Sequence, residues 1–364
     1  IPMLIISSVN KVKDTGSGEG HLHELHDQQG MVSKVALTSK TIWQPESLPK
    51  VIAEAFALFN GARPGPVHIQ LPIDIITADA SHVERPPRSN TSADHVSLPQ
   101  VMRPLPNPAQ LDLIIESLKT AKNPVLLYGG GCVDVDQDAQ KLAELIDAPT
   151  FLTINAKGLL PPRHPLSLGS NQSLAAGRAV ITEADWVLAI GTELGETDYD
   201  VFFNGGFHIN GKLIRIDCDA AQLQRPFRAD IAVLGDAQLA ISGLCARLKG
   251  QAFDHQAVSR VNDAKQDLIK DITPDFAGQN ALLQLIRDEI EDVIFVGDST
   301  QPVYSGNLGF EALATRRWFN SSTGFGTLGY GLPAAIGAMI GSKVPVVSLM
   351  GDGGIQFTIA ELIC

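Results

Sequence analysis

Residues 346–355, VVSLMGDGGI, join a short apolar run to a helix through a turn in which glycines surround one aspartate. The apolar run predicts a buried strand. Glycines allow a ligand to approach the backbone and its N–H groups, and a helix N-terminus favours an anion. Asp352 would repel a bare phosphate, but Mg²⁺ is typically held by one or two carboxylates together with phosphate oxygens. The turn therefore suggests a Mg²⁺–diphosphate site with Asp352 as metal ligand; the alternative is a tight turn capped by the aspartate.

The composition indicates a soluble globular protein of two or three domains. The chain has 364 residues, of which 44% are hydrophobic and 19% are charged. Its net charge of −12 argues against a nucleic-acid partner, and its apolar runs are too short to span a membrane. The four cysteines form no CxxC pair, so zinc ribbons and redox motifs are not expected. A reduced, cytoplasmic setting is the expectation.

The order of apolar runs predicts three α/β segments separated by two linkers. Residues 1–80 contain PMLIISS, an amphipathic SLPKVIAEAFALFNG and RPGPVHIQLPIDI, which predict strand, helix and strand. Residues 81–107 are rich in proline and polar residues and predict a linker. Residues 108–250 alternate nearly continuous apolar strands with helices, as in a parallel sheet covered on both faces. Residues 251–278 are polar and predict a second linker, and residues 279–364 return to the α/β alternation.

The two ends of the sequence suggest a piece of a longer chain. The sequence opens on IPMLIISSVN without an initiator methionine, and it stops inside an expected helix. The expected fold is therefore α/β, with three doubly wound parallel-sheet domains of which the first and the last are incomplete.

Two further stretches lie at the ends of expected strands. Residues 324–337 contain five glycines and end in a strongly helical pattern, and VGDSTQPVYSGN ends a strand in small polar residues. Within the first stretch, GFGTLG is a weak match to a dinucleotide-binding turn, because no clear strand precedes it and no acidic residue follows at the expected distance. Open α/β sheets bind ligands at the carboxyl ends of their strands, so all three stretches are candidates for one site.

Together these motifs resemble the thiamine-diphosphate-dependent enzymes of the acetolactate synthase and 2-oxo acid decarboxylase superfamily. The resemblance is carried by GTLGYGLPAAIGA at residues 326–338 and by GDGGIQF at residues 351–357. RPGPVHIQLPIDI is similar to the end of the pyrimidine-binding domain of that family, and PVLLYGGGC and RIDCDA are similar to its central domain. The resemblance implies a pyrimidine-binding, a central and a diphosphate-binding domain. It also implies that a glutamate of the pyrimidine domain and a second metal ligand fall outside this sequence, so the chain as given is expected to be inactive alone.

The family roles can be carried over residue by residue. Asp352 is similar to the metal ligand. Leu328 takes the place of a large apolar residue that wedges the two cofactor rings into a V shape, although an ordinary core leucine is the alternative. Gln301 belongs to a stretch similar to the family loop that touches the diphosphate and faces the substrate. The implied cofactor-binding residues are Gly326, Thr327, Leu328, Gly351, Asp352, Gly353, Gly354, Asp298, Ser299 and Thr300.

A histidine-rich loop supplies a candidate for proton transfer. GHLHELHDQ aligns loosely with a segment that reaches the active site in the synthases, and it contains His21, His23 and His26. Histidine is the side chain best suited to move protons near neutral pH, and His23 is the preferred candidate. A solvated loop histidine is the alternative for each of the three.

The resemblance implies thiamine diphosphate and Mg²⁺ as cofactors and a small 2-oxo acid as substrate. A homodimer or homotetramer with the cofactor at the subunit interface is implied, with no nucleic acid and no membrane. FAD is not expected, because IGTELGETDYD lacks the arginine-containing segment of FAD-binding synthases. The sequence looks most similar to the branch that decarboxylates 5-guanidino-2-oxopentanoate (2-ketoarginine). The alternatives are an acetolactate synthase-like carboligase, a non-catalytic binding module, and a nicotinamide-dependent dehydrogenase.

Overall fold

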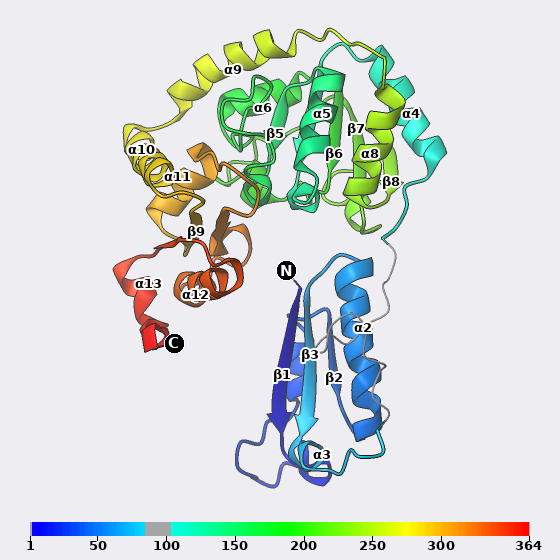
Figure 1. The fold of residues 1–364 in the computed structure, drawn as a ribbon, viewed down its shortest axis with the longest axis vertical. Coiled ribbons are helices and arrows are strands. Elements are labelled where there is room, and N and C mark those ends of the chain that lie inside the picture. Colours follow the sequence, from blue (N-terminus) through cyan, green and yellow to red (C-terminus); the bar gives the residue numbers. More distant parts are fainter. Residues whose placement is uncertain (1, 84–102, 364) are drawn as a thin grey trace. The chain divides into compact units, whose positions relative to one another are not determined.

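The computed structural model describes residues 2–83 and 103–363, which form two compact units divided in sequence between Pro104 and Leu105. Parallel strands form three sheets, of three, five and three strands, and helices connect them (Figure 1). This confirms the α/β class and the three parallel sheets expected from the sequence. The first sheet belongs to the first unit, and the other two belong to the second unit.

The first unit is built on a sheet with the strand order β1-β3-β2, in which both pairings are parallel. Strand β3 is its buried centre: Val67 and Ile69 are almost fully covered, and so are the alternating polar residues His68 and Gln70. The short strand β2 was not expected, because its sequence TSKT is polar and lacks an apolar alternation. The elements of this unit are β1 (Met3–Val9), α1 (Gln28–Val32), β2 (Thr38–Thr41), α2 (Leu48–Gly61), β3 (Pro66–Pro72) and α3 (Ile73–Ile76).

The central part of the second unit contains the five-stranded sheet, with the order β5-β4-β6-β7-β8. The order reverses between β4 and β6, which is the mark of a doubly wound sheet. Its strands are β4 (Pro124–Tyr128), β5 (Thr150–Leu152), β6 (Trp186–Ile190), β7 (Lys212–Asp217) and β8 (Ile231–Leu234). Its helices are α4 (Pro108–Thr120), α5 (Asp136–Ile146), α6 (Ala175–Thr182), α7 (Glu196–Tyr199), α8 (Ala237–Leu248) and α9 (Ala257–Asp271).

Two apolar layers cover the faces of this sheet. Successive residues of a strand point to opposite faces, so Leu126 packs with α4, α5 and α8, whereas Leu127 packs with α6 and α9. Both residues are fully buried. The continuous apolar strands that the sequence showed therefore result from burial on both faces.

Residues 251–278, expected as a polar linker, contain α9 and the first turn of the next helix. Helix α9 buries Ala257, Val261, Ala264 and Leu268 on one face. Intervals of four, three and four residues are those of a helical stripe, which the overall polarity of the segment concealed. Helix α9 covers the same face as α6 and is seen at the edge of the central part in Figure 1.

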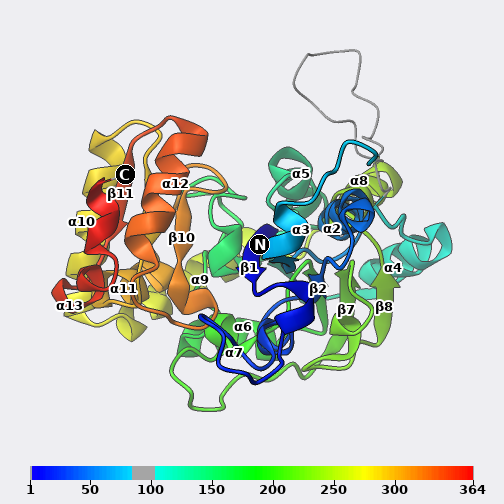
Figure 2. The same cartoon turned by 90° about the horizontal axis from the view of Figure 1, so that it is seen from below.

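The last part of the second unit is built on the parallel sheet β10-β9-β11. Strand β9 comes first in the chain and lies in the middle, so the strand order reverses between β9 and β11. Phe295 packs with residues of α10 and α11 on one face, while Ile294 and Val296 pack with Ala335 of α12 on the other. Helices thus surround this small sheet (Figure 2). The elements are α10 (Pro274–Glu289), β9 (Ile294–Gly297), α11 (Gln301–Gly309), β10 (Trp318–Asn320), α12 (Gly331–Ser342), β11 (Val346–Leu349) and α13 (Asp352–Gln356).

Buried hydrogen bonds join the central part to the last part. The ammonium group of Lys157 donates to the carbonyl of Phe310 at 2.8 Å and also to the Ser170 hydroxyl. The Ser170 hydroxyl donates in turn to the carbonyl of Asn307 at 2.6 Å. Burial lowers the pKa of Lys157 to about 7, against the influence of Glu311 and Asp198. The carbonyls near the end of α11 are therefore held by side chains of the central part.

Most of the expected linker at residues 81–107 lies outside the described residues. Among residues 2–83 and 103–363, no helix is both long enough and apolar enough to cross a bilayer.

Candidate active site

The candidate site lies at the carboxyl ends of β9 and β11, the neighbouring strands between which the order of the last sheet reverses. Asp298 follows β9, and the turn that contains Asp352 follows β11. The Asp298 N–H donates to the Leu349 carbonyl at 3.0 Å, so the two strand ends are joined directly. Crevices at such switch points are where open α/β sheets bind ligands.

The Asp352 turn has room for a ligand. Asp352 is exposed and opens α13, with Gly351 in extended conformation immediately before it. A Cβ atom added at Gly351 or Gly353 would meet no atom within 4 Å. In the described part of the chain, no three His, Cys, Asp or Glu residues gather so as to hold a metal ion by themselves. One open carboxylate beside bare backbone fits a Mg²⁺ ion that takes its remaining ligands from phosphate oxygens and water.

Asp298 is in a different environment, although the resemblance assigned it to the same ligand. Its side chain is fully buried. Its Oδ2 accepts the N–H of Gly329 at 2.8 Å, and its Oδ1 accepts the N–H of Gly331 at 2.6 Å. Gly331 begins α12, so this carboxylate also lies at the positive end of that helix. Both oxygens of Asp298 are therefore engaged by backbone.

The glycine-rich loop before α12 presents apolar side chains to solvent. Gly326 and Gly329 have φ angles of +67° and +79°, which a residue with a side chain adopts only under strain. Between them, Leu328 is 50% exposed, and Phe325 just before them is 90% exposed. Leu328 is therefore not an ordinary core leucine. Gly326 and Thr327 are exposed as well.

This loop and the Asp352 turn lie against each other. A Cβ atom at Gly354 would be 2.8 Å from Oδ2 of Asp298 and 4.0 Å from Cδ2 of Leu328. The Thr358 hydroxyl donates to the Gly329 carbonyl at 3.2 Å. The structure thus brings Leu328, Gly354 and Asp298 close to one another.

Ser299, Thr300 and Gln301 have separate surroundings. The hydroxyls of Ser299 and Ser321 are 3.3 Å apart, which ties the end of β9 to the start of the glycine-rich loop. Thr300 precedes α11, and its carbonyl accepts the N–H groups of Val303 and Tyr304.

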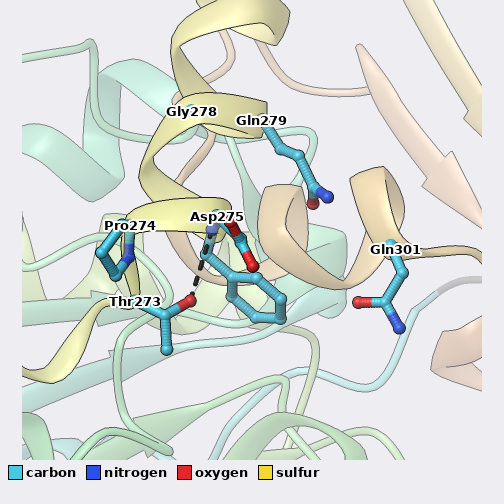
Figure 3. A pocket seen from close by; sticks show the side chains of 7 residues that line it. Thr273, Pro274, Asp275, Gly278, Gln279 and Gln301 are labelled. Carbon is cyan, nitrogen blue, oxygen red and sulfur yellow. Dashed lines mark hydrogen bonds between the residues drawn. The ribbon is translucent and has the colours of Figure 1, made fainter.

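Gln301 lines an open pocket of about 540 Å³ between the first turns of α10 and α11 (Figure 3). The pocket is lined by Thr273, Pro274, Asp275, Phe276, Gly278, Gln279 and Gln301. None of these residues belongs to the loop 326–331 or to the turn 351–354. Gln301 therefore lies at the same edge of the sheet, but the pocket that its side chain borders is not lined by the loop 326–331 or by the turn 351–354.

His23 lies in an exposed loop of the first unit, with a φ angle of +60°. The organising residue of this loop is Glu24, which sequence reasoning missed. Its carboxylate accepts the N–H groups of Gly18, Gly20 and His21 at 2.5, 2.9 and 3.0 Å. These bonds, that of Gly18 first, lower the pKa of Glu24. A carboxylate among closely spaced glycines was the signal for this arrangement.

A second group missed from the sequence is a buried amide network behind the glycine-rich loop. The Asn307 side-chain oxygen accepts from Trp318 Nε1 at 2.9 Å and from Asn320 Nδ2 at 2.8 Å. Its Nδ2 donates to the Ser322 hydroxyl at 2.8 Å. The network fixes the segment that leads from β10 into the loop.

The glycines of YGGGC serve close packing in the central part. A Cβ atom at Gly129 would lie 2.1 Å from the carbonyl oxygen of Gly191, and one at Gly131 would lie 2.9 Å from the Gly191 Cα. The turns after β4 and β6 therefore touch through bare backbone. The three glycines of this stretch thus form a tight turn directly after β4.

Two family models match the chain. "Thiamine pyrophosphate enzyme, central domain" matches residues 111–244, and "Thiamine pyrophosphate enzyme, C-terminal TPP binding domain" matches residues 298–364. The second match contains the loop and the turn described above.

Three known proteins are similar in sequence to this chain over most of its length. A probable 2-ketoarginine decarboxylase, AruI, of Pseudomonas aeruginosa is 38% identical over 365 residues, which are 100% of this chain and 63% of the relative. A probable acetolactate synthase large subunit of Methanocaldococcus jannaschii is 30% identical over 92% of this chain and 58% of the relative. The acetolactate synthase isozyme 1 large subunit of Escherichia coli is 28% identical over 87% of this chain and 55% of the relative. The chain thus spans less than two thirds of the length of these relatives, and it belongs to the thiamine pyrophosphate enzyme family.

Proposed function

We propose that the protein is a thiamine diphosphate- and Mg²⁺-dependent enzyme that decarboxylates a 2-oxo acid, with 5-guanidino-2-oxopentanoate as the substrate. The observation that carries the proposal is the pairing of the exposed Asp352 turn with the loop 326–331 at one switch point. The substrate follows the probable 2-ketoarginine decarboxylase, with which the chain shares 38% identity.

The residues of the chain have distinct parts in this proposal. Asp352 would hold Mg²⁺, and the backbone of Gly351, Gly353 and Gly354 would accommodate the diphosphate. The backbone of the loop 326–331 would contact the aminopyrimidine, and the exposed side chain of Leu328 would pack against the cofactor. Thiamine diphosphate, when bound, supplies the electron sink that a decarboxylation requires. His23 and Gln301 stay candidates for contacts with the reacting groups.

The cofactor part of the proposal is tested by titrating thiamine diphosphate into the full-length protein in a calorimeter, with and without Mg²⁺. We expect binding that requires Mg²⁺ and that Asp352→Ala abolishes. Asp134→Ala, which removes an aspartate of the central part that pairs with Arg316, should bind as the wild type does. Binding that is unchanged by Asp352→Ala would contradict the assignment.

The substrate part is tested by CO₂ release from 5-guanidino-2-oxopentanoate and from pyruvate. Faster release from the guanidino acid supports the proposal. A preference for pyruvate with acetolactate as product would favour the carboligase alternative, which the relatives named acetolactate synthase suggest. Cofactor binding without release from either acid would favour a binding module.

A homodimer or homotetramer is proposed as the assembly. Its support is the exposure of Phe325 and Leu328, two large apolar side chains beside the candidate site. Light scattering coupled to size exclusion checks this: a monomer in the presence of thiamine diphosphate and Mg²⁺ would exclude a site between subunits.

A further inference from the structure

Asp298 links three segments of the candidate site through one buried side chain. It follows β9, it accepts N–H groups at both ends of the sequence Gly329-Tyr330-Gly331, and its Oδ2 faces the backbone of Gly354. The side chain is 0% exposed, and each of its two oxygens accepts a backbone N–H. A carboxylate that accepts two backbone N–H bonds fixes the position of the donors more strongly than a neutral acceptor does.

The location of the bonds determines what Asp298 positions. Gly331 is the first residue of α12, whose preceding residue Tyr330 makes no side-chain cap. Asp298, which follows β9 and lies 33 residues earlier in the chain, therefore accepts the free N–H at the start of α12 in place of an N-cap side chain. This bond sets where α12 begins. Leu328 is exposed immediately before the first of these bonds. A change in the bond to Gly329 would thus change where Leu328 stands relative to the Asp352 turn.

We propose that Asp298 is a positioning residue: its buried carboxylate holds the loop 326–331 against the Asp352 turn, so that the two segments face one ligand together. This inference rests on the proposed function for the identity of that ligand, thiamine diphosphate. The contacts made by Asp298 stand independently of it.

The test uses Asp298→Asn in the full-length protein. Asparagine has nearly the same shape, but its amide offers one acceptor oxygen and an NH₂ group, so one of the two N–H groups loses its acceptor. The matched control is Asp185→Asn. Asp185 also accepts two backbone N–H groups, those of Lys122 at 2.7 Å and Asn123 at 2.8 Å, but it lies in the central part.

Hydrogen exchange of the cofactor-free protein is the first measurement. Peptides that cover residues 326–332 should exchange at least about 5-fold faster in Asp298→Asn, since a buried bond has been lost. They should exchange as in the wild type in Asp185→Asn. Unchanged exchange in Asp298→Asn would overturn the positioning role, whether or not the protein binds thiamine diphosphate.

Binding is the second measurement, by calorimetry at saturating Mg²⁺. The Kd for thiamine diphosphate should rise about 10- to 100-fold in Asp298→Asn, and the Kd for inorganic pyrophosphate, which has no rings for the loop to contact, should rise less. A general loss of stability would instead raise the Kd values for thiamine diphosphate and for pyrophosphate by similar factors. Equal affinity of wild type and Asp298→Asn for thiamine diphosphate would overturn the link to the cofactor. A wild type that binds none would refute the proposed function while the exchange result still decides the positioning role.

If Asp298→Asn does not accumulate in folded form, Asp298→Ser provides the same comparison. Serine is smaller and retains one acceptor oxygen, so it creates no overlap in this buried position. The exchange and affinity results expected for it have the same direction.

Discussion

Removing the Lys157 ammonium group should change how the stability of the second unit depends on pH. Lys157 is 5% exposed, and burial lowers its pKa to about 7. In the unfolded chain a lysine titrates near 10.4. Between these two values the unfolded chain binds a proton that the folded chain has released. The free energy of unfolding must therefore rise with pH in this window. Above the unfolded pKa neither state is charged, so the destabilisation caused by burying Lys157 is gone and the rise ends.

The size of the effect follows from the separation of the two pKa values. Each pH unit inside the window is worth up to about 1.4 kcal/mol. Because the folded group is half titrated near its own pKa, the expected gain from pH 7 to pH 9 is about 2 kcal/mol. Lys157→Met lacks this gain. The variant also leaves the Phe310 carbonyl without its donor, but that loss shifts the stability at every pH and does not change the slope.

The assay is urea unfolding followed by far-UV circular dichroism at pH 7, 8 and 9. The stability of the wild type minus that of Lys157→Met should grow by about 2 kcal/mol over this range. Lys270→Met is the control, because Lys270 is an exposed lysine whose pKa is raised by its hydrogen bond to Asp267. The stability of the wild type minus that of Lys270→Met should not grow between pH 7 and pH 9. If the wild type and Lys157→Met give parallel curves, Lys157 is not buried as described or does not release its proton near neutral pH.

Two further predictions concern glycines and the melting temperature of the cofactor-free protein. Gly354→Ala should lose roughly 1–3 kcal/mol of stability, because its Cβ would lie 2.8 Å from Oδ2 of Asp298. Gly353→Ala should be neutral or slightly stabilising, because its Cβ would meet no atom within 4 Å. Equal melting temperatures for the two variants would contradict this account of the turn. Gly129→Ala should destabilise the central part by about 1–3 kcal/mol or more, because its Cβ would lie 2.1 Å from the carbonyl of Gly191. A melting temperature within one degree of the wild type would show that the two turns can separate easily.

The sequence predicted the sheets well because their strands are buried on both faces. VLLY and VLAI are continuous apolar runs, and burial of both faces produces such runs whatever the rest of the fold does. Strand β2 escaped detection because TSKT has no apolar residue. Helix α9 could have been found, since positions 257, 261, 264 and 268 have helical spacing, but a judgement based on average polarity obscured that stripe.

The candidate site was harder to predict in detail than in location. Asp298 and Asp352 both follow apolar strands and look equivalent in the sequence. The structure separates them: Asp352 is exposed, whereas Asp298 is bonded to N–H groups 31 and 33 residues further along the chain. Such a difference depends on where a distant loop passes, which local patterns do not encode. The same holds for Gln301, whose pocket is completed by the first turn of α10.

Helix α9 has a practical consequence for preparing the central part alone. A fragment cut at residue 250, where the sequence pattern places the end of that part, would lack Val261, Ala264 and Leu268 and would leave the face beside α6 open to water. Such a fragment should be prone to self-association during expression. An expression boundary placed after Asp271 keeps this cover in place and is the better choice for crystallisation or spectroscopy.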